Sequence, residues 1–137
     1  MPLLLVRHAR AGDRAEWEGD DRERPLDDRG LEQAARLVEQ VARFTVEAIL
    51  ASPHVRCVQT VEPLAAARGL PVQLRAELAE ERQRLDGAAL VRSLAGRDVV
   101  VCGHGGLDGV LQGAPKWKKG ATFVLGADLE LLETLRS

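Results

Sequence analysis

Residues 1–10 have the sequence MPLLLVRHAR. The four apolar residues at positions 3–6 form a run short enough for one fully buried strand, and Arg7 and His8 follow it directly. A buried parallel strand that ends in Arg-His places both side chains at the carboxyl edge of a sheet, where open α/β folds bind ligands. An arginine there offers a planar cation to a phosphate or carboxylate, and a histidine can act as a nucleophile or proton carrier. This segment therefore predicts an anion-handling site.

The remainder of the chain alternates between short apolar runs and amphipathic segments. This pattern predicts strands at 46–51, 71–74 and 98–102, helices at about 30–43, 53–68 and 86–94, a short helix at about 107–111, and a closing hairpin of 122–125 with 129–134. Residues 10–28 are dense in charge and predict a long loop. The whole pattern predicts a single α/β domain over residues 1–137, a three-layer sandwich with a mainly parallel central sheet and helices on both faces.

Composition limits the partners that the protein can have. Of the 137 residues, 45% are hydrophobic and 29% charged, and the formal net charge is −2, so we expect no overall attraction to nucleic acid or to an anionic membrane. No apolar run approaches the roughly 20 residues of a transmembrane helix, and no secretory signal is visible, so we expect a cytoplasmic protein. Cys57 and Cys102 lack the spacing of a zinc site and are expected to be small buried residues.

Three predicted strands end in comparable signals. Arg7-His8 follows the first, a turn containing Arg56 follows the second, and Gly103-His104-Gly105 follows a later one. If these strands are parallel neighbours, two arginines and two histidines meet at one sheet edge, and helices that begin there direct N–H groups at it. Such a set suits a phosphoryl group better than a carboxylate. The chain has no carboxylate cluster for magnesium, no Walker motif, and no spacing that supports zinc on His8, His54 and His104, so we expect neither metal nor cofactor.

These motifs resemble those of the histidine phosphatase superfamily. Arg7-His8-Ala9 matches its Arg-His-Gly motif with alanine in place of glycine, residues 52–60 match its Ser-Pro-x-x-Arg-x-x-Gln-Thr signature in full, and His104 matches its late strand-end histidine. The short length and Arg24-Pro25-Leu26 are similar to the SixA-type phosphohistidine phosphatases, which implies a bacterial protein. The run 6–26 is also similar to the histidine-phosphatase domain attached to some MutT-like Nudix hydrolases. The departure at Ala9 adds only a methyl group, and we expect activity to survive it.

The resemblance implies a two-step phosphotransfer without metal. His8 would attack phosphorus and form a phosphohistidine that water hydrolyses, while Arg7, Arg56 and His104 would hold the phosphoryl oxygens. The superfamily often places a glutamate that donates a proton after the third strand. Leu78-Ala79-Glu80 fits that position. Glu77 and Glu81 lie close enough in the sequence to compete with Glu80 for this role.

The sequence does not determine the substrate. The implied partner is a phosphohistidine protein or a small phosphorylated molecule; the alternatives are a nucleotide (di)phosphate and, for an inactive phosphate-binding module, a recruited protein. Trp17, Trp117 and the lysines Lys116, Lys118 and Lys119 could stack a base and bind further phosphates, or Trp17 could anchor its loop and the lysines form a solvated turn. His54 could reach the substrate or be a partly exposed residue at a helix start. The sequence does not indicate the oligomeric state.

Overall fold

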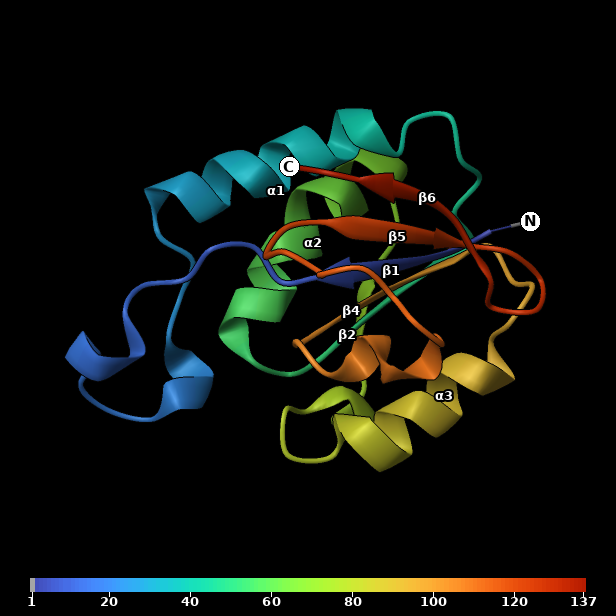
Figure 1. Cartoon of the computed structure of the whole chain (residues 1–137). Coiled ribbons are helices and arrows are strands. Elements are labelled where there is room, and N and C mark those ends of the chain that lie inside the picture. Colours follow the sequence, from blue (N-terminus) through green and yellow to red (C-terminus); the bar gives the residue numbers. More distant parts are fainter. Residues whose placement is uncertain (1) are drawn as a thin grey trace.

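Six strands form one sheet in the computed structural model, which describes residues 2–137 (Figure 1). Their order is β3-β2-β4-β1-β5-β6. The first four in this order pair in parallel, β5 runs antiparallel to β1, and β6 runs antiparallel to β5. The sheet is therefore mainly parallel, as predicted. The strands are β1 (Leu3–Arg7), β2 (Ala48–Ala51), β3 (Val72–Leu74), β4 (Val99–Gly103), β5 (Thr122–Leu125) and β6 (Leu131–Leu135).

Helices cover both faces of this sheet, which confirms the three-layer sandwich. The helices α1 (Asp28–Gln40) and α2 (Val55–Arg68) pack against each other on one face, and α3 (Ala88–Ser93) covers the other (Figure 1). Side chains of β1 alternate between two apolar cores, as the pleat of a strand requires. Leu4 and Val6 belong to the core under α1 and α2, and Leu3 and Leu5 belong to the core on the α3 side.

Helix boundaries differ from the prediction where capping decides them. The α1 helix starts two residues before the expected Gly30, because the carboxylate of Asp27 accepts the Gly30 N–H and caps the first turn. The third helix was expected to begin at about residue 86, but the Asp86 carboxylate pairs with Arg82 at 2.9 Å and caps no helix. Residues Gln83–Gly87 form a π-helical turn instead, and α3 follows without a side-chain cap.

The segments between the main elements contain short turns. The predicted loop at 10–28 holds two 3-10 turns, Arg14–Glu16 and Asp21–Glu23, and is joined to itself by a β-bridge between Ala11 and Leu26. The helix predicted near 107–111 is a 3-10 turn, Leu107–Val110, so it directs no α-helical N-terminus at the sheet edge. Both cysteines are buried and free, as predicted. Within residues 2–137, none of the helices is long and apolar enough to cross a bilayer.

Gly30 holds the chain that leaves β1 against the start of α1. A Cβ atom on Gly30 would lie 1.9 Å from the carbonyl oxygen of Arg10, which itself accepts the Asp27 N–H at 3.1 Å. The contact is with backbone, which cannot rotate away as a flexible side chain can. Glycine is therefore required at position 30, because two backbones approach closely there. The contacted residue, Arg10, lies only two residues beyond His8.

We expect Gly30→Ala to lower the free energy of unfolding by about 1–3 kcal/mol, because the added methyl group must displace the Arg10 backbone. Urea denaturation measures this change. Gly12→Ala, in the loop that precedes α1, is the control, since a Cβ on Gly12 meets no atom within 4 Å. The control should stay within about 0.5 kcal/mol of the parent. Equal effects of the two substitutions would contradict the close-approach argument.

Candidate active site

Strand order brings the three predicted strand ends together. The β4 strand lies between β1 and β2 and runs parallel to both. The His8 N–H donates to the Gly103 carbonyl at 3.0 Å, and the Ser52 N–H donates to the Cys102 carbonyl at 3.0 Å. The ring centroids of His8 and His104 are 5.5 Å apart. The two histidines therefore meet at the carboxyl edge of the sheet.

The His8 imidazole is buried and held in one tautomer. Its Nδ1 lies 2.8 Å from the carbonyl oxygen of Ala9. Since a carbonyl oxygen can only accept, this contact places the proton on Nδ1 and leaves the lone pair on Nε2. Burial, together with the charges of Arg56 and Arg7, lowers the pKa of His8 to about 3, although the bond to Ala9 acts in the opposite direction. The ring is therefore neutral near pH 7.

The two predicted arginines, Arg7 and Arg56, differ in how deeply their side chains are buried. Arg7 is half-buried, donates from Nη1 to the Trp117 carbonyl at 2.6 Å, and lines the cavity in front of His8. Arg56 is fully buried, with 0% of its side chain exposed. Its Nη2 contacts Asp21 Oδ2 at 3.2 Å and Glu80 Oε1 at 3.3 Å. Arg56 is thus not among the residues that line the cavity, and two carboxylates contact its Nη2.

His104 is also almost fully buried, with 1% exposure. Its Nε2 lies 2.9 Å from the Ser52 hydroxyl oxygen, and its Nδ1 has no hydrogen-bond partner among residues 2–137. Burial, followed by the neighbouring His8 and His54, lowers the pKa of His104 to about 2. His104 is not among the residues that line the cavity; it is a second neutral imidazole whose ring lies edge-on to that of His8.

Among the three competing glutamates, Glu80 is the one at the cavity. Its carboxylate contacts Arg56 at 3.3 Å and Arg14 at 3.3 Å. Glu77 pairs with Arg75 and Glu81 with Arg22, each at 2.7 Å, and neither of them lines the cavity. The structure therefore places the predicted position, and not its two neighbours, beside the site.

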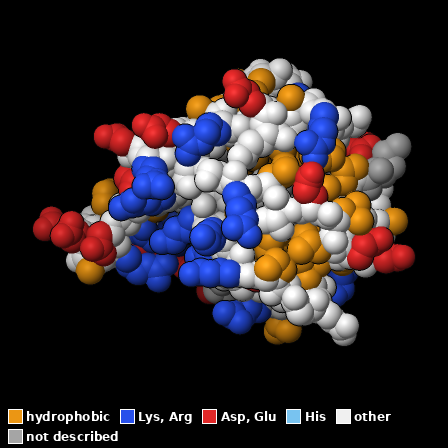
Figure 2. All heavy atoms as spheres, turned by 45° about the horizontal axis from the view of Figure 1, so that its top comes forward, with side chains coloured by type: hydrophobic (Ala, Val, Ile, Leu, Met, Phe, Trp, Pro, Cys, Tyr) orange, Lys and Arg blue, Asp and Glu red, His pale blue; other side chains and the backbone are white. Residues whose placement is uncertain are grey.

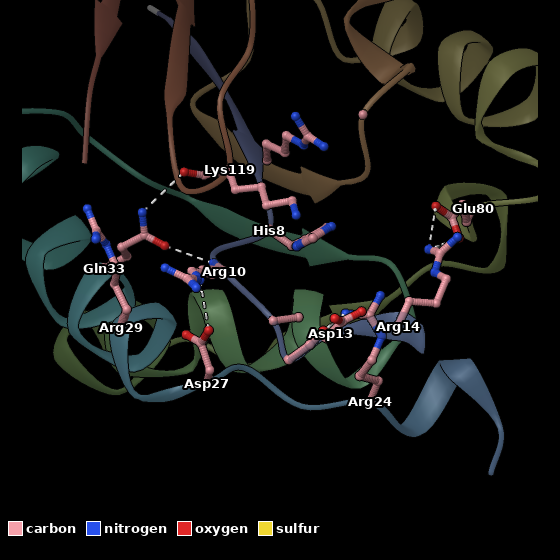
Figure 3. Close-up of a pocket in the computed structure, with 14 residues that line it drawn as sticks. His8, Arg10, Asp13, Arg14, Arg24, Asp27, Arg29, Gln33, Glu80 and Lys119 are labelled. Carbon is pink, nitrogen blue, oxygen red and sulfur yellow. Dashed lines mark hydrogen bonds and ion pairs between the residues drawn. The ribbon is translucent and has the colours of Figure 1, made fainter. Parts of the chain in front are cut away.

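The cavity in front of His8 has a volume of about 830 Å³ and an excess of cations (Figure 3). Lysine and arginine side chains also gather in one area of the surface in the space-filling view (Figure 2). Within residues 2–137, no group of three or more His, Cys, Asp or Glu side chains is arranged to hold a metal ion. The cavity is suited to a substrate with several negative charges. Its lining cations are Arg7, Arg10, Arg14, Arg24, Arg29 and Lys119, and its carboxylates are Asp13, Asp27 and Glu80.

Several residues support the site from behind. Thr60, in the second motif, accepts the Ala9 N–H at 2.8 Å, and Gln59 accepts the Leu26 N–H at 2.8 Å. Gln83 accepts the His104 N–H and donates to the Gly105 carbonyl, both at 2.9 Å. Sequence reasoning missed Gln83 because it lies in a charged run of no clear periodicity. One buried amide among exposed charges carries no local signal.

The structure also shows where the two tryptophans, His54 and the three lysines of the sequence analysis lie. Trp117 was considered for stacking on a base, but it is 3% exposed and stacks on Phe123, so it is a core residue. His54 was expected to be partly exposed, but it is 3% exposed and its ring lies 4.5 Å from that of His104. Trp17 anchors its loop by donating its indole N–H to the Asp20 carbonyl at 2.9 Å. Of the three lysines at 116–119, only Lys119 lines the cavity.

This fold and this site define an α/β protein that presents a neutral histidine and an arginine to an anion at the carboxyl edge of its sheet. Residues 3–90 match the family model of the histidine phosphatase superfamily (branch 1). The chain belongs to that superfamily, and the prediction of a phosphatase enzyme is confirmed at this level. The motif residues Arg7, His8 and Arg56 all lie within the matched range.

Individual relatives agree with this assignment. The chain is 37% identical to an 8-oxo-(d)GTP phosphatase of Mycolicibacterium smegmatis over 95% of its own length. It spans 46% of that protein, less than half of the relative's length. A structure of the protein histidine phosphatase SixA with tungstate matches with a TM-score of 0.80 and 22% identity, over 98% of this chain and 96% of that one. A mycobacterial glucosyl-3-phosphoglycerate phosphatase matches with a TM-score of 0.72 and 17% identity, over 94% and 95%.

The lowered pKa values of His8 and His104 make the stability of the protein depend on pH. Between about pH 6.5 and pH 3 an unfolded His8 binds a proton that the folded one does not, and the same holds for His104, so the free energy of unfolding falls as the pH falls through this range. We expect a loss of about 2 kcal/mol for each of these histidines between pH 7 and pH 5. Urea denaturation at both pH values measures it.

His8→Asn provides the control for this pH dependence. It removes one titrating group, so the difference in stability between pH 7 and pH 5 should shrink by about 2 kcal/mol. An unchanged difference in this variant would show that His8 titrates in the folded protein as it does in a free peptide.

Proposed function

We propose that this protein is a phosphatase that transfers a phosphoryl group first to Nε2 of His8 and then to water. The observation that carries the proposal is the contact of His8 Nδ1 with the Ala9 carbonyl, which leaves the lone pair of Nε2 free on a buried, neutral ring. A neutral imidazole is a nucleophile at pH 7 without a separate base. Arg7 lines the cavity beside this ring, so a phosphate bound there lies within reach of both.

The first step forms the bond between Nε2 and phosphorus while the bond from phosphorus to the leaving oxygen breaks. The electron pair of that bond stays on the leaving oxygen. In the second step water attacks phosphorus, the N–P bond breaks, and its electron pair returns to Nε2. Arg7, Arg56 and His104 are proposed to hold the phosphoryl oxygens and to stabilise the charge that develops on them. For His104 the proposed contact is through Nδ1, which has no hydrogen-bond partner among residues 2–137, whereas Nε2 faces Ser52. Arg56 can do so once its outer nitrogen is released from Asp21 and Glu80.

Glu80 is proposed as the proton donor. It lines the cavity at the strand edge with His8, so its carboxyl group can protonate the leaving oxygen in the first step and accept a proton from water in the second. Glu77 and Glu81 are each held by an arginine outside the cavity. The proposed reaction needs no metal and no other cofactor.

The substrate is proposed to be a phosphohistidine protein or a small phosphomonoester. A second candidate, a nucleoside phosphate, is favoured by the relative that is 37% identical and is named an 8-oxo-(d)GTP phosphatase. A hollow of about 250 Å³, lined by Trp17 and Leu26, adjoins the cavity and shares Gly12 and Arg24 with it. An inactive phosphate-binding module would not need a neutral histidine with a free lone pair.

His8→Asn should abolish turnover of para-nitrophenyl phosphate and the acid-labile, base-stable phosphoenzyme that trapping with labelled substrate detects. His54→Asn removes a buried imidazole outside the cavity and should still form the phosphoenzyme. Turnover that His8→Asn leaves intact would remove His8 as the nucleophile. A parent protein that binds phosphate but never turns over would support the inactive module instead.

Glu80→Gln should lower kcat for a phosphomonoester with a poor leaving group by about 10²-fold or more, since general acid catalysis contributes about 10²–10⁴. Its effect should be much smaller for para-nitrophenyl phosphate, whose leaving group needs no proton. Glu77→Gln and Glu81→Gln are matched controls that lie three residues before and one residue after Glu80 in the chain. A loss in either control as large as that in Glu80→Gln would contradict this assignment.

The substrate classes are ranked by a panel of a phosphohistidine peptide, a sugar phosphate, dGTP and 8-oxo-dGTP at equal concentrations. The class with the highest kcat/KM is the physiological candidate. A clear preference for the phosphohistidine peptide would exclude the nucleotide alternative, and a preference for 8-oxo-dGTP would support it.

A further inference from the structure

The cavity holds more positive charge than one phosphoryl group requires. Three of its cations have carboxylate partners: Arg10 pairs with Asp27, Arg14 with Glu80, and Arg24 with Asp21. Within residues 2–137, the other three, which are Arg7, Arg29 and Lys119, make no ion pair. Arg7 is already assigned to the transferred phosphoryl group. Arg29 and Lys119 are therefore cations in the cavity that the proposed reaction leaves without a role.

These two side chains lie on one side of His8. Arg29 comes from the first turn of α1, and Lys119 from the loop before β5. Figure 3 shows both on the α1 side of the cavity with Gln33, whereas Arg14 and Glu80 lie on the opposite side. A substrate with its phosphoryl group at His8 can therefore meet two different surroundings, one with the proposed proton donor Glu80 and one with two cations that make no ion pair among residues 2–137.

The side of the cavity next to α1 is fixed by backbone contacts. Gln33 accepts the Arg10 N–H at 2.8 Å and donates to the Lys119 carbonyl at 3.2 Å. The next residue, Gly120, donates its N–H to the His8 carbonyl at 3.0 Å. The backbone of Lys119 is thus bonded to α1 on one side and to the end of β1 on the other. A cation whose backbone is already held in place loses less entropy when an anion binds.

The charges at this position also act on each other. Burial, followed by the guanidinium groups of Arg7 and Arg24, lowers the pKa of Lys119. The ammonium of Lys119 in turn contributes to the lowered pKa of His8. Burial is the largest cause of both shifts, and repulsion between neighbouring cations adds to it. A bound anion beside Lys119 removes this repulsion.

We propose that Arg29 and Lys119, with Gln33 between them, form a subsite for a second phosphate next to the phosphoryl group that His8 receives. This inference rests on the proposed phosphatase function and assigns its substrate class, an organic diphosphate such as a nucleoside diphosphate. The bond between the terminal phosphorus and the bridging oxygen breaks, and the electron pair stays on that oxygen. The leaving group is then itself a phosphate, whose charge is stabilised by cations and needs no proton.

Binding tests the subsite without turnover. Methylenediphosphonate, which has carbon in place of the bridging oxygen, should bind the parent protein at least about tenfold more tightly than inorganic phosphate in calorimetry, as expected for one further charge-assisted contact. Arg29→Gln and Lys119→Gln should each remove most of this advantage. Arg36→Gln on the same helix and Lys118→Gln in the same loop are matched controls that should retain it. Equal affinities for the two anions in the parent would overturn the proposal.

Kinetics then separate the subsite from the chemistry at His8. GDP and GMP differ only in the second phosphate, so the ratio of their kcat/KM values reports on the subsite. Arg29→Gln should lower this ratio about tenfold, and Arg36→Gln should leave it unchanged. An equal loss for both nucleotides in Arg29→Gln would overturn the proposal. Loss of the phosphohistidine intermediate from the parent would instead contradict the proposed function, while the binding result would still test the subsite.

Discussion

The parallel pairing of β4 with β1 on one side and β2 on the other is the constraint on which the site depends. The register places Arg7 opposite Gly103 and Ala51 opposite Cys102, so the ends of the three strands lie within one residue of the same level. The residues that follow these strands are therefore brought to the same carboxyl edge of the sheet. They are His8, Ser52 and His104. A change of one residue in either register would turn the side chains of that strand to the other face. The site is therefore a property of the sheet as much as of its motifs.

Burial at this edge has opposite consequences for its imidazoles and its guanidinium. His8 and His104 lose their charge when they are buried, which leaves them neutral and costs the protein little near pH 7. Arg56 cannot lose its proton in the same way and is fully buried, so it requires anions around it. Asp21 and Glu80 supply them. The charged loop 10–28, which contributes Asp21, thus compensates a buried cation that lies 35 residues away in the chain.

The sequence predicted the sheet edge well because the signals there are local. Each apolar run is followed directly by its candidate site residue. The motif around Arg56 also contains Gln59 and Thr60, whose side chains bond the backbone near the site. The strand order follows from few alternatives once the strands are assigned. Glu80 was also placed correctly at the cavity, although its catalytic role stays a prediction.

Features that depend on contacts between distant segments were not predictable. The burial of Trp117 follows from its stacking on Phe123, and the burial of His54 from its position beside His104. Gln83 acquires its importance only because a π-helical turn brings it under the backbone of His104 and Gly105. The cavity cations come from residues 7–29 and from Lys119, so no short window of sequence contains all of them.

The carboxylates on Arg56 have a consequence for how a catalytic cycle ends. Asp21 Oδ2 and Glu80 Oε1 occupy the same guanidinium nitrogen to which a phosphoryl oxygen is proposed to bind. In the proposed reaction, inorganic phosphate formed in the cavity would compete with two tethered carboxylates at high local concentration. These carboxylates would return to Arg56 when the product leaves. Such competition would weaken product inhibition and would also lower the affinity for the incoming substrate.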